Sequence, residues 1–447
     1  MTVTNEMLDT WATDPAGPVA LHLKQELLAV EDLKGEGGVI FPPTYADIGY
    51  NIDTLSDGKR IATIDSVGSQ ANRLEPIFEA APGANREQWL VPQIEIVLRS
   101  APCGKCEPCK QAAAAANEAA SAEEEAEQEN TEEAKNRAKE ARKKADKAKK
   151  ELTKGCTTPR EVKRSIFELA HRAADAVVQS SPGLVALVEN AFRTLLDGDA
   201  GPLCELAPTS LVFGVWDSRG GSGEKRPRLV RSIIRAWDVE PLHAAAQFNS
   251  VWKLLDGEQR AALEKAVKGR DKEGKLSTAG LKDAPATFRK TKIEKYRDGA
   301  PNPEARVLGG VLARGGIERQ VTVNLVALRG LRGADEAETA AIRKYLLGLS
   351  LIAATADIEL FLREGCHLRY ADEKDTWYQV PRRGAPTEVT LDVTTIKAYA
   401  TAAANHFRPK WKETWPTDDR LKYTFDLREA KMLLAKKTEE EEAAGGA

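Results

Sequence analysis

Residues 216–237 read WDSRGGSGEKRPRLVRSIIRAW, and this stretch carries more information than any other in the chain. It predicts a strand that runs through a glycine-rich turn into a helix, because Pro227 suits the first turn of a helix. Arg228, Arg231 and Arg235 recur at intervals of three and four residues, which would align them on one helix face. Six basic residues against two acidic ones give the stretch a net charge of +4. We therefore expect a local site for a polyanion.

The glycine-rich loop at residues 220–223 suggests phosphate, because backbone amides and a helix N-terminus both attract an anion. Two nucleotide motifs do not match, however. The lysine-containing phosphate loop needs Gly directly before Lys, and here Glu224 precedes Lys225; the dinucleotide fingerprint needs a third Gly where Arg226 stands. A long polyanion fits this charge better. A phosphate-cofactor enzyme that uses this loop is the alternative, and a solvated basic helix is the simplest interpretation.

A second set of arginines is interleaved with glycine pairs between residues 306 and 333. Guanidinium groups bind phosphate in a forked geometry and stack on bases, so two such segments favour a groove that follows a nucleic-acid backbone. The set comprises Arg306, Arg314, Arg319, Arg329 and Arg332.

The overall charge limits where a polyanion can bind. Sixty-five Lys and Arg against 68 Asp and Glu leave a net charge of −3, which excludes a uniformly basic nucleic-acid wrapper. The most apolar charge-free run, Tyr345 to Ala356, has twelve residues, whereas a membrane helix needs about 20. The N-terminus lacks a basic region followed by an apolar one, so we expect a cytoplasmic protein without a signal peptide.

The chain offers little for catalysis. Its five histidines stand apart, and none belongs to a hydrolase, zinc-protease or nuclease motif. His171 and Asp175 share a helix face in the predicted structure, and a surface pair is the simpler explanation. We therefore expect no enzyme.

Turn signals and apolar patterns predict a mixed α/β (α+β) chain. Short strands are expected near residues 39–40, 59–64 and 93–98, with a helix after Asn72. Further helices are expected at 160–178, 184–196 and 335–364, and a strand at 319–331. These patterns divide the chain into residues 1–102, the first part of a core; 103–156, a cysteine cluster with a helical insertion; 157–255, the core continuation with the basic segment; 256–306, a loop-rich excursion; 307–430, the core completion; and 431–447, an acidic disordered tail.

The insertion is rich in Ala, Glu, Lys and Arg, and it splits into two helices, 110–129 and 132–154, near a start signal at Asn130. The first carries a net charge of −5 and the second +5, which favours an antiparallel hairpin. A solvated, partly disordered spacer is the alternative, because alanine seams bury little area.

Four cysteines have the spacing of a metal site. Cys103, Cys106 and Cys109 form a double CxxC, and a hairpin with arms of roughly 30 Å would return Cys156 to the same place. Structural zinc is expected; an iron–sulfur cluster and reduced free cysteines are the alternatives. Cys204 and Cys366 are expected to be ordinary core residues.

Two blocks of sequence carry a family resemblance. Asp57-Gly58-Lys59-Arg60 with Ser69-Gln70-Ala71-Asn72-Arg73-Leu74-Glu75, and Phe213-Gly214-Val215-Trp216-Asp217-Ser218 with Lys225-Arg226-Pro227-Arg228, resemble the backbone RAMP subunit of type I-G (formerly I-U) CRISPR effector (Cascade) complexes. The resemblance implies an RRM-like (ferredoxin-like) core whose copies polymerise along a CRISPR RNA. It also implies other effector subunits as partners, and target DNA contacted through the guide heteroduplex. Besides the RNA-binding subunit and the phosphate-cofactor enzyme, a third possible function is a zinc-dependent scaffold that binds no nucleic acid.

On this resemblance and the basic pattern we expect one set of RNA-binding residues. For two of them a structural role is the alternative: Asn72 would cap a helix and Gln70 would fix a turn. The set is Gln70, Asn72, Arg73, Ser218, Arg219, Lys225, Arg226, Arg228, Arg231, Arg235, Arg314 and Arg319.

Overall fold

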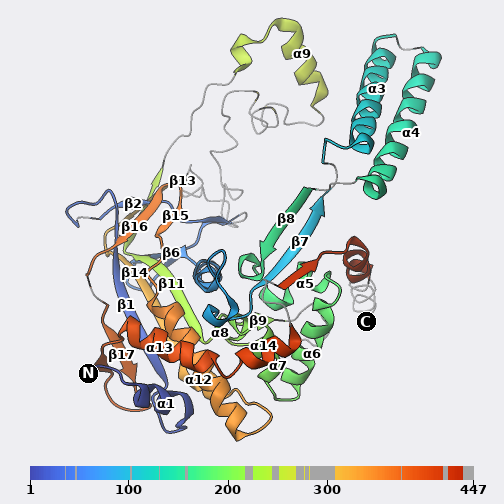
Figure 1. Cartoon of the computed structure of the whole chain (residues 1–447). Coiled ribbons are helices and arrows are strands. Elements are labelled where there is room, and N and C mark those ends of the chain that lie inside the picture. Colours follow the sequence, from blue (N-terminus) through green and yellow to red (C-terminus); the bar gives the residue numbers. More distant parts are fainter. Residues whose placement is uncertain are drawn as a thin grey trace, which may run out of the picture. The chain divides into compact units, whose positions relative to one another are not determined.

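The computed structural model of the chain (Figure 1) describes residues 1–35, 37–45, 48–100, 103–129, 131–156, 160–216, 225–243, 251–267, 276, 281, 308–373, 375–415 and 421–435. The chain forms two compact units. We call the first, residues 1–77, 228–330 and 343–401, the sheet unit. We call the second, residues 78–227, 331–342 and 402–447, the hairpin unit.

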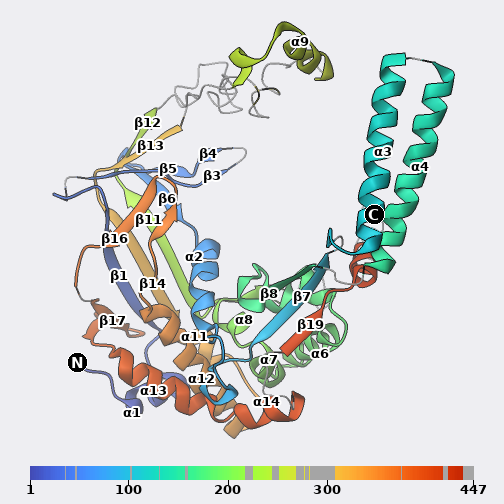
Figure 2. The ribbon, with the colours of Figure 1, turned by 45° about the horizontal axis from the view of Figure 1, so that its top comes forward.

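The sheet unit is built on an antiparallel sheet of nine strands (Figure 2). Its main path runs β15 (Phe361–Arg363), β16 (Cys366–Tyr370), β1 (Ala20–Ala29), β14 (Ile317–Asn324), β11 (Val230–Trp237), β6 (Arg60–Asp65) and β5 (Ile52–Thr54). Beside this path, β17 (Trp377–Val380) pairs with β1 and with β18 (Thr387–Val389).

The order of the central strands confirms the expected RRM-like class. Along the chain, β1 is followed by α2 (Val67–Leu74), then by β11 and β14, then by α12 (Glu336–Thr355) and β16. This is a β-α-β-β-α-β sequence. In space the strands lie in the order fourth, first, third, second, and each neighbouring pair is antiparallel. The fold class is therefore mixed α/β with an RRM-like core and insertions.

The alternation of residues along the strands gives the sheet two different faces. In β1, Leu21, Leu23 and Leu27 are fully buried, whereas Lys24 and Glu26 between them are exposed. The same alternation continues through β14 and β11, because residues directly opposite in antiparallel strands share a face. One face thus belongs to the core, and we call the other the outer face.

Two contacts fix the helices of the sheet unit. Gly348 of α12 lies so close to α13 (Val393–Ala404) that a Cβ atom there would stand 2.8 Å from the Cα of Ala400. The N-terminal α1 (Asn5–Thr13) is tied by Asp9, which accepts hydrogen bonds from Lys344 at 2.7 Å and from Tyr399 at 3.0 Å.

Smaller elements complete the sheet unit. They are β2 (Val39–Ile40), β3 (Thr44–Tyr45), β4 (Gly49–Tyr50), β12 (Val239–His243), β13 (Leu308–Ala313), α9 (Gly257–Ala266) and α11 (Leu325–Arg329), with 3-10 turns at Glu75–Phe78 and Val251–Leu254.

The hairpin unit has its own small sheet, in which β7 (Ile94–Ser100) pairs antiparallel with β8 (Arg160–Ser165) and parallel with β19 (Leu421–Thr424). A two-stranded ribbon, β9 (Val215–Trp216) and β10 (Lys225–Arg226), belongs to the same unit. Its shorter helical elements are α5 (Ala176–Gln179), α6 (Leu184–Leu196), α7 (Gly201–Leu206), α8 (Thr209–Val212) and α14 (Arg408–Thr414), with 3-10 turns at Arg86–Gln88, Ile166–Glu168 and Arg172–Ala174.

The inserted helical hairpin is confirmed (Figure 2). It consists of α3 (Glu107–Glu129) and α4 (Glu132–Gly155), and Thr131 caps α4 by accepting a hydrogen bond from the Ala134 backbone. The seam between the helices is made of alanines at spacings of three and four residues, among them Ala115, Ala119, Ala126, Ala134 and Ala138. Three exposed ion pairs flank it: Arg137 with Glu129, Arg142 with Glu123, and Lys144 with Glu118.

Four expectations about elements were wrong. Residues 160–178 form β8 and short turns rather than one helix, and the strand expected at 319–331 ends at Asn324, where α11 begins. The helix expected over 335–364 ends at Thr355. The arginine helix is instead strand β11. Arginines four residues apart share a face in a helix and in a strand alike, and here β-branched Val230 and two isoleucines favour the strand.

The helix of residues 184–196 is confirmed. Much of the expected excursion at 256–306 and most of the acidic tail lie outside the described residues. Within the part of the chain that the structure describes, every helix is too short or too polar to cross a bilayer.

Candidate functional site

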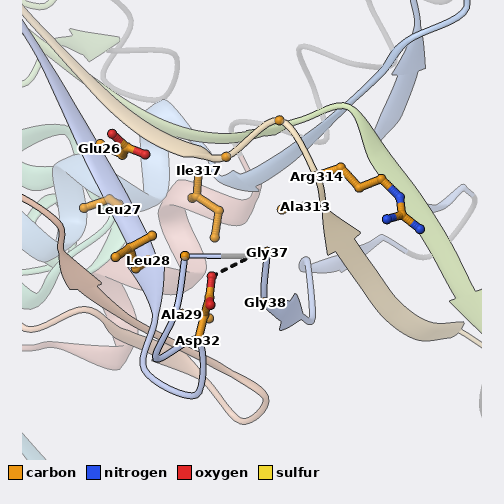
Figure 3. A pocket seen from close by; sticks show the side chains of 13 residues that line it. Glu26, Leu27, Leu28, Ala29, Asp32, Gly37, Gly38, Ala313, Arg314 and Ile317 are labelled. Atoms are coloured by element: carbon orange, nitrogen blue, oxygen red, sulfur yellow. Dashed lines mark hydrogen bonds between the residues drawn. The ribbon is translucent and has the colours of Figure 1, made fainter.

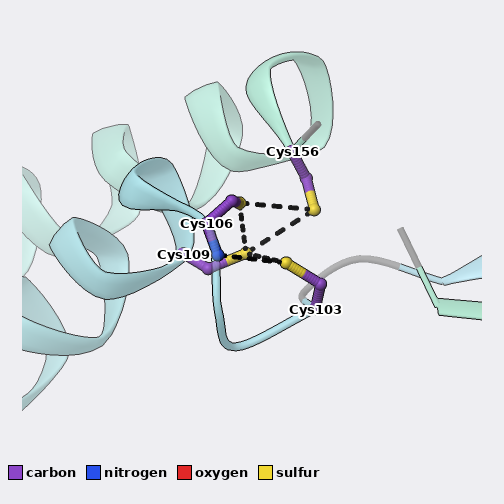
Figure 4. A group of neighbouring side chains, drawn as sticks. All are labelled: Cys103, Cys106, Cys109 and Cys156. Atoms are coloured by element: carbon purple, nitrogen blue, oxygen red, sulfur yellow. Dashed lines mark hydrogen bonds between the residues drawn. The ribbon is translucent and has the colours of Figure 1, made fainter. Parts of the chain in front are cut away.

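The four cysteines of the double CxxC and its distant partner converge in the hairpin unit (Figure 4). All their sulfur atoms lie within 4.8 Å of one another. The Sγ of Cys109 lies 3.5 Å from that of Cys103, 3.2 Å from that of Cys106 and 3.6 Å from that of Cys156. The Sγ atoms of Cys106 and Cys156 are 3.7 Å apart. The expected convergence is therefore confirmed.

The local sequence explains this convergence. Gly104 takes a φ of +70°, which turns the chain so that the amides of Lys105 and Cys106 donate to the Cys103 sulfur at 3.5 and 3.3 Å. Cys109 stands in the first turn of α3, and Cys156 is the C-cap of α4. Because the arms have nearly equal length, the antiparallel hairpin returns its last residue to its first.

The spacing of the sulfurs fits a tetrahedral ion. Zinc bound by four thiolates at about 2.3 Å holds them about 3.8 Å apart, close to the separations observed here. Burial, together with the hydrogen bonds that Cys109 shares with Cys106 and Cys103, raises the pKa of the Cys109 thiol to about 12. This thiol stays neutral at pH 7 unless a cation holds its thiolate.

A second candidate surface is the outer face of the sheet unit. One row across four strands places Tyr378, His22, Thr322 and Arg231 side by side. The following rows of β1, β14 and β11 add Lys24, Gln320, Ile233, Glu26, Glu318 and Arg235. Neither Arg231 nor Arg235 has a hydrogen-bond or ion-pair partner among the described residues.

The electrostatics of this face vary along the strands. Lys24 pairs with Glu318 at 2.6 Å, so one acidic group there is already neutralised. His22 Nδ1 lies 3.0 Å from the Thr322 hydroxyl. Burial, together with the nearby charges of Arg231 and Lys24, lowers the pKa of His22. Its imidazole is therefore neutral at pH 7 and acts as a hydrogen-bonding group rather than a cation.

Beneath the sheet, two of the expected RNA-binding residues form a buried polar chain. Gln70 is 0% exposed; it donates to Asp65 at 2.6 Å and accepts from Ser232 at 2.7 Å. Arg319 is 1% exposed; it donates to Ser232 at 3.2 Å and to Gln25 at 2.9 Å. Neither side chain reaches solvent, so the structure corrects their placement on a contact surface.

The other two candidate residues of the first block, Arg73 and Asn72, have different surroundings. Arg73 is partly exposed, but its guanidinium is tied to Asp65 at 3.1 Å and to the Leu362 carbonyl at 2.6 Å. Asn72 is exposed within α2, whose N-cap is Ser66, so the capping role considered for Asn72 was wrong. Gln70 does fix the local structure, although through Asp65 rather than a turn.

The remaining basic candidates lie on several elements. Arg228 is exposed ahead of β11, and Arg314 pairs with Glu240 at 2.6 Å while its side chain stays 59% exposed. Lys225 and Arg226 form β10 in the hairpin unit. Ser218, Arg219 and the glycine loop at 220–223 lie outside the described residues.

Sequence reasoning missed most of the outer face. His22, Lys24, Thr322 and Tyr378 carry no motif, and each becomes noticeable only when the strands are paired. One signal was available: residues 21–27 read LHLKQEL, which alternates apolar and polar residues over most of its length, as a strand with one solvated face does.

One cavity of about 260 Å³ lies at the end of β1 in the sheet unit (Figure 3). Much of its wall is glycine backbone, and Asp32 accepts a hydrogen bond from the Gly37 amide at 3.0 Å. The lack of side chains reflects close packing, since a Cβ at Gly38 would lie 2.4 Å from that of Ala29. Arg314 points away from the cavity. We assign no ligand to it.

Part of the chain matches a known protein family. The family described as CRISPR-associated protein GSU0053 matches residues 21–241, a range that begins in β1 and ends in β12. A search of curated proteins found no match. The matched range holds both blocks of the resemblance and the cysteine cluster. The match therefore supports a CRISPR-associated protein of the Cas/RAMP type.

Proposed function

We propose that the chain is a backbone subunit of a type I-G CRISPR effector complex and holds the guide RNA by its phosphates. Two observations support this proposal: the match to a family of CRISPR-associated proteins, and an RRM-like sheet whose outer face presents Arg231 and Arg235 without acidic partners among the described residues. The two arginines carry the argument, because a charged side chain without a partner on a regular sheet face is available to an anionic ligand.

The spacing of these arginines suits an extended strand of RNA. Arg231 and Arg235 lie four residues apart on β11, so they are roughly 13 Å apart along the strand. They therefore contact different phosphates. Guanidinium groups bind phosphate through two parallel hydrogen bonds, and this contact does not depend on the base.

The rest of the outer face complements these contacts. Neutral His22 and Thr322, in the same row as Arg231, can hydrogen-bond to ribose hydroxyls or to base edges. Glu26 lies on β1 in the row of Arg235 and repels phosphate, whereas Glu318 in the same row is neutralised by Lys24, so the RNA path is expected along the arginine side.

A subunit of this kind performs no chemistry of its own. Its sequence-tolerant grip leaves the bases of the guide free to pair with target DNA, so specificity resides in the RNA. Copies of the chain would follow one another along the guide, together with other effector subunits in the cytoplasm.

The direct test is to coexpress the chain with a CRISPR array and to analyse the nucleic acid that copurifies. The expected result is RNA of defined length that is sensitive to ribonuclease. An Arg231→Ala/Arg235→Ala variant should lose this RNA, and an Arg383→Ala/Lys397→Ala control, which removes two exposed cations elsewhere in the sheet unit, should keep it. Purified wild type free of RNA would contradict the proposal.

We also propose that the four-cysteine cluster holds one structural zinc ion. An iron–sulfur cluster attaches its cysteines to different iron atoms and so spreads them more widely, whereas here all four sulfurs lie within 4.8 Å. Zinc would hold the base of the hairpin, whose alanine seam buries little apolar surface.

Elemental analysis tests this second proposal. We expect about one zinc per wild-type chain, little in Cys156→Ser, and a full complement in Cys204→Ala, which removes a buried cysteine outside the cluster. Metal-free wild type would contradict zinc binding, and two to four equivalents of iron with matching inorganic sulfide would replace zinc with the iron–sulfur alternative.

A further inference from the structure

We propose that Trp216 is a stacking platform for an unpaired base of the bound RNA; this inference rests on the RNA-binding function proposed above. All eight tryptophans of the chain lie within the described residues. Five are buried and two are intermediate, whereas Trp216 is 59% exposed. An indole left in water on a chain with few aromatic residues needs an explanation other than folding.

The ribbon of β9 and β10 holds this indole in solvent because its two faces have different surroundings. Val215 is 6% exposed, and its partner Arg226 donates a hydrogen bond of 3.0 Å to the Leu195 carbonyl of α6. These two residues attach one face of the ribbon to the hairpin unit. Trp216 and Lys225, which also lie opposite each other, occupy the other face.

Lys225 completes a site with two kinds of contact. Its ammonium lies 5.6 Å from the centroid of the Trp216 ring, in a cation–π contact. The cation covers one side of the ring and adds positive charge beside it. A flat π-system with an adjacent ammonium matches a nucleotide, because the base stacks on the ring while the ammonium pairs with a phosphate.

The chain near the ribbon favours RNA over a protein partner. Residues 227–229 join β10 directly to β11, so the outer-face arginines follow the ribbon closely in sequence. Basic residues outnumber acidic ones six to two in the stretch 216–237. A protein contact would need surrounding apolar area, but the residue opposite Trp216 in the ribbon is a lysine.

The test compares two oligonucleotides that share a sugar–phosphate backbone: a single-stranded RNA and its abasic analogue. Fluorescence anisotropy of labelled oligonucleotides gives the affinities. Trp216→Ala should weaken binding of the RNA roughly 5- to 150-fold, the range found for loss of one base–aromatic stack. It should leave binding of the abasic strand unchanged, and Trp216→Phe should retain most of the wild-type affinity for RNA.

Two further variants separate this inference from the proposed function. Phe361→Ala removes another exposed aromatic side chain, 53% exposed in the sheet unit, and should change neither affinity. Arg231→Ala/Arg235→Ala should weaken both oligonucleotides. Suppose that the double arginine variant weakens binding of both oligonucleotides as expected. The stacking role alone is then overturned if Trp216→Ala binds RNA as tightly as wild type, or if it weakens binding of the RNA and of the abasic strand equally. If wild type binds neither oligonucleotide, both proposals are overturned. Loss of self-association in Trp216→Ala with unchanged RNA affinity would make the indole a protein contact and overturn the stacking role.

Discussion

The guanidinium of Arg319, buried on the inner face of the sheet, donates a 2.9 Å hydrogen bond to the side-chain oxygen of Gln25 on the neighbouring strand. The two residues are directly opposite in the β1–β14 register. Gln25 donates in turn to Asp375 at 2.5 Å, and Arg319 donates to Ser232 on its other side. Burying a charge at this depth is costly unless it is hydrogen-bonded, and Arg319 uses its Nε and Nη1 groups to bond to side chains on the two neighbouring strands. Arg319 therefore links three strands.

We predict that Arg319→Ala lowers the free energy of unfolding by about 3–5 kcal/mol, because it leaves buried polar partners without a donor. Denaturant titration measures this loss. At a temperature where the variant is folded, its affinity for RNA should equal that of wild type. A normal stability together with weakened RNA binding would contradict the structural role of Arg319.

Gly348 provides a test of helix packing in the sheet unit. Alanine is a better helix former than glycine by about 1 kcal/mol, yet a Cβ at position 348 would stand 2.8 Å from the backbone of Ala400. Gly348→Ala should therefore destabilise the protein by about 1–3 kcal/mol. The matched control is Gly68→Ala in α2, where the nearest atom to the new Cβ is 4.0 Å away. This control should raise the melting temperature; if both substitutions raise it, α12 and α13 are not in close contact.

A cluster of charges in the hairpin unit predicts a pH dependence. Lys410 bridges Glu205 at 2.6 Å and Glu338 at 2.9 Å, and His406 lies 3.1 Å from Glu338. Partial burial by itself would raise the pKa of Glu338. Hydrogen bonds from Lys410 and His406 outweigh this effect and lower the pKa of Glu338 below its ordinary 4.5. The ionised carboxylate therefore stabilises the fold fully above about pH 4.5, and this stabilisation is lost as the pH falls through the lowered pKa.

Glu338→Gln should accordingly cost about 1 kcal/mol at pH 7, and the difference from wild type should shrink as the pH falls below about 4.5. Thermal melts between pH 3 and pH 7 give this comparison. Glu413→Gln, an exposed carboxylate on α14, serves as the control and should follow wild type throughout. A constant deficit of the Glu338 variant at every pH would show that its charge plays no part.

The sequence allows some of this structure to be predicted because some signals are local. The hairpin follows from helix propensity and from alanines at spacings of three and four, and the meeting of Cys156 with Cys109 follows from two arms of similar length. Strand β11 could not be told from a helix, since arginines four residues apart fit both periods. Residues on the inner face were harder still: an arginine usually marks a surface, and the burial of Arg319 depends on β1, β11 and β14, which are far apart in the chain.

The central claim is that the outer face grips RNA phosphates through Arg231 and Arg235, and the salt dependence of RNA affinity tests it most directly. Anisotropy titrations of one single-stranded RNA at several KCl concentrations should give a slope of log affinity against log salt that is shallower by about 1.4 in Arg231→Ala/Arg235→Ala than in wild type, because two phosphate contacts are lost. The affinity should fall at least about tenfold at low salt, and Arg383→Ala/Lys397→Ala should match wild type. An unchanged slope in the folded double variant would contradict the claim.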